Sequence, residues 1–125
     1  MSVDLFAGIA VSDYPRAMAW YELLFGAAPS FFPNDREAVW EIAEHRYVYI
    51  ETRPGDAGHA MHTLFVTDLT GWTTAISGRG LEAADQQDYS NGVRKVTYRD
   101  PDGNEFGFGG NVGRTSAPAG ATETS

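Results

Sequence analysis

The feature that most constrains this chain is a pattern that occurs twice. Val11-Ser12-Asp13 closes a short apolar strand and precedes a helical pattern, and Val66-Thr67-Asp68 does the same in the second half. Ser, Thr and Asp side chains accept hydrogen bonds from the free N–H groups of a helix's first turn, so each triplet predicts a helix start. Strand-like segments separated by turn residues follow each helix. The sequence therefore predicts the order β-α-β-β-β twice, an α+β fold of two modules.

The elements of this order can be placed along the chain. The first helix is predicted to begin near Pro15 and to end at Gly26. The second is predicted to follow Asp68 and to end at Gly78 or Gly80. The predicted strands are 6–11, 30–32, 40–43, 46–52, 63–66, 85–88, 92–99 and 105–109.

The length and composition indicate one globular domain. The chain has 125 residues, of which 42% are hydrophobic, which is enough to bury a core without disulfide bonds or a structural metal. We predict a domain over residues 1–112, with modules at about 1–55 and 60–112. Residues 113–125 contain no large apolar side chain and are predicted to form a disordered tail.

Charge and cysteine content exclude several classes of partner and site. The chain has no cysteine, which excludes disulfides, thiolate zinc sites and cysteine nucleophiles. A net charge of −8 repels phosphate backbones and anionic lipids, so neither nucleic acid nor a membrane is predicted as a partner. No signal-like or membrane-spanning apolar run is present, and we expect a soluble cytoplasmic protein.

Further motifs accompany the two triplets. They are Ala19-Trp20-Tyr21, Leu24-Phe25-Gly26, His62 six residues before Asp68, and Arg99-Asp100-Pro101-Asp102-Gly103-Asn104. With these motifs in this order, the chain resembles the vicinal oxygen chelate superfamily, which includes glyoxalase I, bleomycin-resistance proteins and extradiol dioxygenases. The resemblance implies that each βαβββ module forms a curved mixed sheet and that two modules enclose a ligand cup. It also implies a homodimer, because two short chains of this family commonly share two cups.

The resemblance also implies where a metal would be held. Metal-dependent members carry four ligands on the cup face, and these positions fall at Phe6, Glu51, His62 and Gly107. Phenylalanine and glycine cannot coordinate a metal, whereas Glu51 and His62 are competent ligands. Two ligands are too few for a catalytic site, so we predict no cofactor, with a divalent metal held by Glu51, His62 and another ligand as the alternative. Glu51 and His62 can also form a hydrogen-bonded pair across the cup.

Aromatic residues are predicted to line the cup instead. Side chains alternate along the strand 46–52, which places Tyr47, Tyr49 and Glu51 on one face. If the hairpin turns near His45, Trp40 faces the same way, and Phe6 joins from the first strand. An aromatic wall of this kind suits flat or conjugated molecules. The alternative is that this face is core or a dimer interface.

The predicted ligand-binding residues are Phe6, Phe32, Trp40, Tyr47, Tyr49, Glu51, His62 and Gly107. From them we expect a metal-independent protein that sequesters an aromatic, hydrophobic or cationic natural product or antibiotic in a cup at a dimer interface. The alternative is an enzyme of the same superfamily, a lyase, isomerase or dioxygenase. It would be metal-dependent or metal-free and would use Glu51 and His62 as catalytic residues.

Overall fold

The structure, a computed structural model, describes residues 2–112 and shows the predicted element order. The first module consists of β1 (Leu5–Val11), α1 (Tyr14–Phe25), β2 (Phe31–Asn34), β3 (Glu37–Ala43) and β4 (Arg46–Thr52). After a 3-10 helix, η1 (Pro54–Asp56), the second consists of β5 (Met61–Phe65), α2 (Leu69–Gly78), β6 (Asp85–Asp88), β7 (Val93–Arg99) and β8 (Glu105–Asn111). The predicted tail over 113–125 lies outside the described residues.

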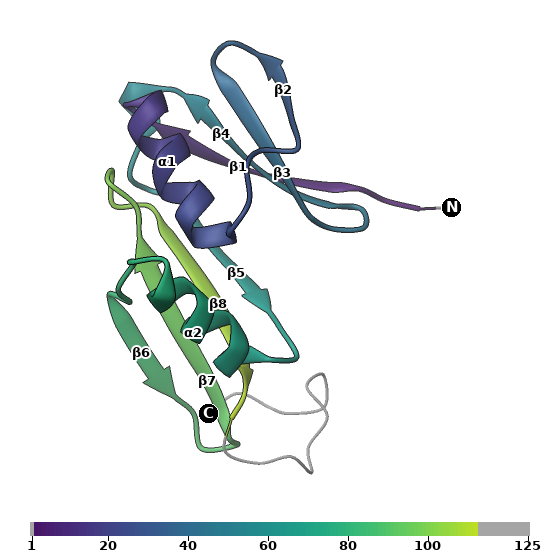
Figure 1. The fold of residues 1–125 in the computed structure, drawn as a ribbon, viewed down its shortest axis with the longest axis vertical. Coiled ribbons are helices and arrows are strands. Elements are labelled where there is room, and N and C mark those ends of the chain that lie inside the picture. The colour runs from purple at the N-terminus through teal and green to yellow at the C-terminus, as the bar shows by residue number, and fades with distance from the viewer. Residues whose placement is uncertain (1, 113–125) are drawn as a thin grey trace.

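Each module forms one four-stranded mixed sheet. The first sheet has the strand order β1-β4-β3-β2 and the second has β5-β8-β7-β6. In each, the first and last strands of the module run parallel and the other pairs are antiparallel. Figure 1 shows the two modules one above the other, with α1 in front of the first sheet and α2 in front of the second. The two-module α+β fold predicted from the repeat is thus observed. No helix within the described residues is long and apolar enough to cross a membrane.

The repeated triplets start the helices as expected. The Asp13 side chain accepts a hydrogen bond from the Arg16 N–H (3.1 Å), and the Asp68 side chain accepts one from the Gly71 N–H (3.0 Å). At the end of α1, Gly26 adopts the left-handed conformation, with φ 73°, that favours glycine. Local capping chemistry therefore fixes where both modules turn from strand to helix.

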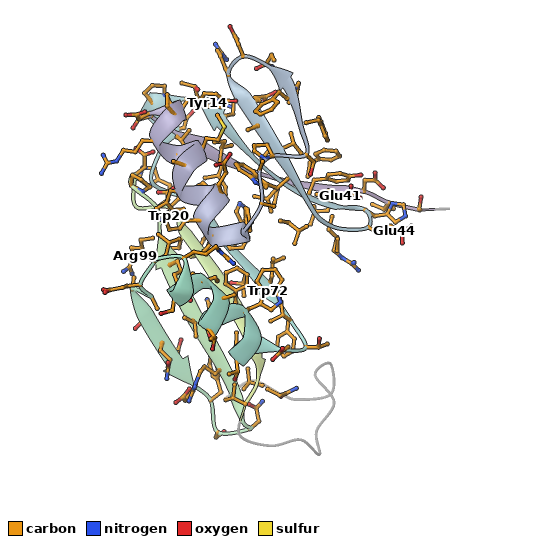
Figure 2. The ribbon with its side chains drawn as sticks, viewed as in Figure 1. Tyr14, Trp20, Glu41, Glu44, Trp72 and Arg99 are labelled. Atoms are coloured by element: carbon orange, nitrogen blue, oxygen red, sulfur yellow. The ribbon has the colours of Figure 1, made fainter. Side chains whose placement is uncertain are left out.

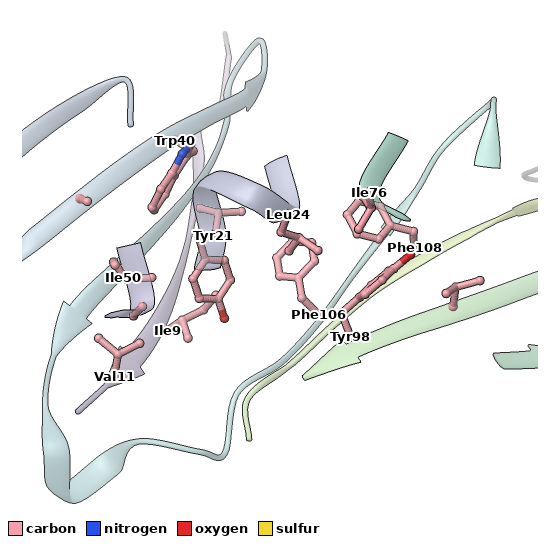
Figure 3. Close-up of a cluster of buried hydrophobic side chains, with 14 of the residues drawn as sticks. Ile9, Val11, Tyr21, Leu24, Trp40, Ile50, Ile76, Tyr98, Phe106 and Phe108 are labelled. Carbon is pink, nitrogen blue, oxygen red and sulfur yellow. The ribbon is translucent and has the colours of Figure 1, made fainter. Parts of the chain in front are cut away.

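A shared apolar core lies between the helices and the sheets (Figure 3). Tyr21 and Leu24 on α1 are fully buried, and Ile76 is the buried residue of α2 near its end. The rings of Phe25 and Phe106 meet edge to face, with centroids 5.3 Å apart, which joins the helix of one module to the sheet of the other. The residues that form the core between the helices and the sheets are therefore mainly apolar.

The turn between β7 and β8 ties the modules together. The buried Tyr21 hydroxyl on α1 donates a 2.8 Å hydrogen bond to the Asp100 carboxylate. Burial, followed by the nearby Asp100 charge and this hydrogen bond, raises the pKa of Tyr21 well above its ordinary value. Arg79, just after α2, donates to the carbonyl oxygens of Leu23 and Leu24 at the end of α1. Polar contacts from the C-terminal half of α1 thus reach the second module.

Asn104, at the end of the same turn, is completely buried. Its side-chain oxygen accepts hydrogen bonds from the N–H groups of Gly58 (3.1 Å) and Ala60 (2.9 Å). Its Nδ2 donates to the Ala10 carbonyl and to the Asp100 carboxylate, both at 2.9 Å. One side chain therefore connects β1, the linker before β5, and the β7–β8 turn.

Candidate functional site

The side of the first sheet that faces away from α1 carries the candidate site. Residues paired across a ladder project to the same side of a sheet, so the register defines this surface, which we name the first open face. Its members are Phe6, Gly8, Ala10, Phe31, Glu37, Val39, Glu41, Tyr47, Tyr49 and Glu51. Tyr47, Tyr49 and Glu51 share this face, as predicted, and Phe6 lies beside Tyr47.

Four aromatic rings on the first open face form what we name the aromatic group: Phe6, Phe31, Tyr47 and Tyr49. The rings of Phe6 and Tyr47 stack with centroids 4.3 Å apart and planes 6° apart, and Phe31 meets Tyr47 edge to face at 6.4 Å. Tyr49 lies over Gly8. A Cβ atom placed on Gly8 would be 2.6 Å from both the Cζ and the Oη atom of Tyr49. A hollow of about 270 Å³ beside these rings is lined by Phe6, Phe31, Pro33, Glu37, Val39 and Tyr49.

The other end of the first open face is polar. A second hollow, of about 470 Å³, is lined by the β1 backbone from Gly8 to Ala10 and by Tyr49, Glu51, Arg53 and Asp56. Arg53 and Asp56 form an ion pair at 3.0 Å, while Arg36 lies 3.9 Å from the Glu51 carboxylate. Tyr49 lines both hollows. A ligand that spans them would meet aromatic rings at one end and charged groups at the other.

Three carboxylates, which we name the glutamate group, lie among the aromatic rings: Glu37, Glu41 and Glu51. Glu41 pairs across the ladder with Tyr47, and Figure 2 shows Glu41 on the first sheet. Desolvation, followed by the negative charges of Glu41 and Asp4, raises the pKa of Tyr47. The phenol therefore stays neutral at physiological pH, and the face presents rings flanked by negative charge. Such a surface favours flat molecules that carry positive charge.

The prediction that Trp40 faces the cup is wrong. Trp40 pairs with Val48 on the helix side of the first sheet, is only 2% exposed, and donates its Nε1–H to the Ala27 carbonyl. The cause is an irregularity in the β3–β4 ladder between Glu41 and Ala43, where one extra residue shifts the pairing. Counted back from the turn, a shift of one residue moves each side chain of β3 beyond the irregularity to the opposite face. Val39 and Glu41 therefore occupy the face predicted for Trp40.

The prediction that His62 lies across the cup from Glu51 is also wrong. His62 pairs with Phe106 on the helix side of the second sheet, with ring centroids 6.2 Å apart. Its Nε2 is 3.1 Å from the Gly8 carbonyl, at the free edge of β1. His62 was placed by a spacing of six residues before Asp68, whereas Phe6 stands seven before its own cap. A spacing of seven in the second module points to Met61, which is on the open side and 73% exposed.

On β2, Phe31 takes the place at the site that the sequence predicted for Phe32. Phe31 pairs with Val39 and lines the apolar hollow, whereas Phe32, which is 55% exposed, does not line it. The residues that sequence reasoning missed are therefore Phe31, Val39 and the two strand glutamates Glu37 and Glu41. The bulged pairing of β3, which decides their side, leaves no clear signal in the sequence.

The corresponding side of the second sheet, which we name the second open face, is different in chemistry. Its members include Met61, Thr63, Phe65, Lys95, Thr97, Arg99, Glu105, Gly107 and Gly109. Gly107 lies on this face, as predicted, and pairs with Thr63 on one side and Thr97 on the other. Arg99, labelled in Figure 2, forms an ion pair with Glu105 at 3.2 Å.

The residues at the family's metal positions do not fit a metal ion. Phe6 and Gly107 offer no ligand atom from a side chain, and Met61 offers only a thioether. Glu51 alone of these residues supplies a competent oxygen. His62 projects to the other side of its sheet. Within residues 2–112, no group of three or more His, Asp or Glu side chains could hold a metal ion. The donor set thus disagrees with the four-ligand centre of the metal-dependent members.

Comparison with known proteins agrees with this architecture. The family model of the Glyoxalase/Bleomycin resistance protein/Dioxygenase superfamily matches residues 3–108. The chain therefore belongs to this superfamily. No curated protein matches the chain.

Solved structures extend the comparison. The chain is similar to a glyoxalase/bleomycin resistance protein from Catenulispora acidiphila DSM 44928, with 55% identity and a TM-score of 0.86 over 89% of this chain and 100% of that chain. A lactoylglutathione lyase from Agrobacterium tumefaciens is similar at 17% identity, with a TM-score of 0.71 over 88% and 94% of the two chains. A bleomycin-binding protein complexed with bleomycin is similar at 16% identity, with a TM-score of 0.72 over 89% and 100%. The last two show a common fold.

Proposed function

We propose that this protein is a metal-independent, cytoplasmic binding protein that sequesters a flat aromatic, positively charged small molecule, such as a natural product or antibiotic. The observation that carries the proposal is the first open face, where members of the aromatic group and of the glutamate group line two adjoining hollows. Rings bind flat ligands by stacking, and carboxylates select positive charge.

Two further observations support this function. A protein of the same fold, the bleomycin-binding protein, is known in complex with bleomycin. The residues at the metal positions favour binding over metal chemistry, because Phe6 turns a chelating position into part of a stacked pair with Tyr47. The ligand-binding roles of Phe6, Tyr47, Tyr49 and Glu51 are part of this proposal.

We also propose that the working form is a homodimer, in which the first open face of one copy meets the second open face of the other. Both faces expose large apolar side chains, among them Phe6 (49%) and Phe31 (45%) on the first and Met61 (73%) and Phe65 (50%) on the second. No residue of the second module lines either hollow of the first face. Sedimentation equilibrium should then give twice the chain mass of 13.6 kDa, and a monomer at about 100 μM would contradict the dimer.

The test of function is calorimetric titration with proflavine, a planar aromatic cation, and with bleomycin. We expect saturable binding of at least one, and Phe31→Ala should weaken it about tenfold, because a lost aromatic pair costs about 1–1.5 kcal/mol. Phe32→Ala is the matched control, since Phe32 is the next residue and is similarly exposed but does not line the hollow. Its affinity should stay within about twofold. Equal losses in both variants, or no binding of either compound below about 1 mM, would overturn the proposal.

A separate measurement addresses the metal. Protein purified without chelators should contain less than about 0.1 equivalent of any transition metal, because the face offers one competent ligand where about three are needed. Stoichiometric metal lost in Glu51→Gln would instead favour an enzyme built around that carboxylate.

A further inference from the structure

Three polar side chains converge on Gly107 in the second open face. An ideal Cβ placed on Gly107 would lie 3.2 Å from Lys95 Cε, 3.4 Å from Thr63 Oγ1 and 3.5 Å from Thr97 Oγ1. Two hydroxyls and the end of a lysine therefore lie close around the position that a side chain of Gly107 would occupy. Thr63 comes from β5 and Lys95 and Thr97 come from β7, the two strands that pair with β8 on either side of Gly107.

None of the three polar groups is engaged within the protein. Lys95 makes no hydrogen bond or ion pair with any residue between 2 and 112, and neither do the hydroxyls of Thr63 and Thr97. Within residues 2–112, by contrast, four arginines pair with carboxylates: Arg36, Arg53, Arg94 and Arg99. An unpaired ammonium is notable in a chain whose net charge is −8.

The surroundings of Lys95 leave its charge available. Its ladder partners are the neutral residues Gln87 and Gly109. Glu105, on the same face, is already paired with Arg99, and Asp85, opposite Thr97, makes no ion pair with Lys95. The surface at Gly107 thus has one positive charge and two hydroxyls that can donate, which is the chemistry that binds an oxyanion.

We propose that Lys95, Thr63 and Thr97 form a binding site for an oxyanion group of a small molecule, with Gly107 adding no side chain that would cover them. This deepens the proposed function, on which it rests for the identity of the site: the ligand of the cup would carry a carboxylate or phosphate at one end in addition to its flat cationic part. The ammonium gives the charge attraction, and the hydroxyls orient the oxygens.

The test uses the fact that Lys95 is the only lysine in the chain. In protein labelled with ¹³C-lysine, benzoate and inorganic phosphate are titrated while the single lysine side-chain signal is followed by NMR. We expect a saturable shift with at least one anion, and no comparable shift with benzamidine, which has the same ring with a positive charge. No saturable shift up to about 50 mM of either anion would overturn the proposal.

Matched variants separate a local site from general charge attraction. Lys95→Gln and Arg94→Gln remove the same charge from adjacent residues of β7, but Arg94 projects to the other face and pairs with Asp88. Anion affinity, followed at the Gly107 amide, should fall about tenfold or more in Lys95→Gln and stay within about twofold in Arg94→Gln. Thr97→Val keeps the side-chain shape and should weaken binding several-fold. Equal losses in the two charge variants would overturn the proposal.

The two proposals fail independently. Proflavine binding that depends on Phe31 would support the proposed function even if neither anion shifts the lysine signal. Anion binding that depends on Lys95 would establish the oxyanion site even if no planar cation binds the first open face. A shift with phosphate only would assign the site to phosphate-bearing ligands, and one with benzoate only to carboxylates.

Discussion

The two modules share a scaffold but present opposite chemistry on their open faces. The sign of the charge is reversed at positions that correspond in the two sheets. Glu37 and Glu41 on β3 correspond to Lys95 and Arg99 on β7. The rings of the first face are replaced by hydroxyls and glycine on the second, as Tyr49 and Gly107 illustrate. The helix-facing sides, in contrast, are aromatic and aliphatic in both modules. Packing thus preserves the repeat on one side of each sheet, while the other side is free to diverge.

The last turns of the two modules differ as strongly. In the first module, β3 and β4 are joined at Glu44 and His45, and His45 adopts a positive φ of 66° on the surface. In the second, the turn from Asp100 to Asn104 is partly buried and bonds to α1 and β1. The first turn makes its contacts within its own module, whereas the second connects the modules.

Removing the Asn104 side chain should produce the largest effect. Asn104→Ala leaves the N–H groups of Gly58 and Ala60 and the carbonyl of Ala10, all part-buried, without the partner that the buried Asn104 side chain provides. Unsatisfied buried groups are costly, so we expect a loss of about 2–4 kcal/mol in the free energy of unfolding. Urea denaturation followed by circular dichroism measures it.

The equivalent change in the first module is the control. Glu44→Ala alters an exposed turn residue and should change stability by less than about 0.5 kcal/mol. If the two variants were equally stable, the contrast between a connecting turn and a simple hairpin turn would be lost.

Much of the scaffold follows from local chemistry in the sequence. The caps at Asp13 and Asp68 and the glycine stop at Gly26 predicted both helices, because such signals depend only on neighbouring residues. The weakly signalled strand 85–88 was placed correctly as well. Family resemblance and capping together therefore sufficed for the fold.

The site was less predictable, because faces depend on register. The irregular pairing between Glu41 and Ala43 reversed the side on which Trp40 lies, and a spacing one residue too short misplaced His62. In a strand, an error of one residue exchanges the two faces. Tyr47 and Tyr49 share one face as predicted, because side chains alternate without interruption along β4, whose pairing with β1 is regular.

Tyr21→Phe tests the link between the modules with a smaller expected effect. It removes the hydrogen bond to Asp100, which keeps donors from the backbone and from Asn104, so we expect a loss of about 1–1.5 kcal/mol at neutral pH. Tyr21→Phe measured by urea denaturation at pH 7 gives this value, and no loss would mean that the bond does not contribute.

The same variant has a signature at high pH. Burial raises the pKa of Tyr21 in the folded protein, so above about pH 10 the unfolded chain loses a proton that the folded chain keeps. Stability is fully present below that pH and falls as pH rises, by at most about 1.4 kcal/mol per pH unit for one proton. Tyr21→Phe should have a shallower decline between about pH 10 and 11 than the wild type; equal slopes would contradict a buried phenol.

Two glycines at matching faces allow a finer comparison. A Cβ on Gly8 would meet the Tyr49 ring at 2.6 Å, whereas a Cβ on Gly107 would meet the flexible end of Lys95 at 3.2 Å. Gly8→Ala should therefore displace the ring and cost about 1 kcal/mol, while Gly107→Ala should stay within about 0.5 kcal/mol. Thermal unfolding measures both, and the reverse order would mean that Tyr49 does not rest on β1.

The smallest expected effect concerns the charge around Tyr47. Desolvation and the charges of Glu41 and Asp4 raise its pKa, so Glu41→Gln should lower that pKa toward the ordinary value, because a neutral neighbour no longer opposes the phenolate. NMR titration of ¹³C-labelled tyrosine follows the change. Glu44→Gln, an exposed change on the same hairpin, is the control and should leave the pKa of Tyr47 in place. Equal shifts in both variants would indicate a general effect of net charge, and the acidic character assigned to the first open face would then not be local to it.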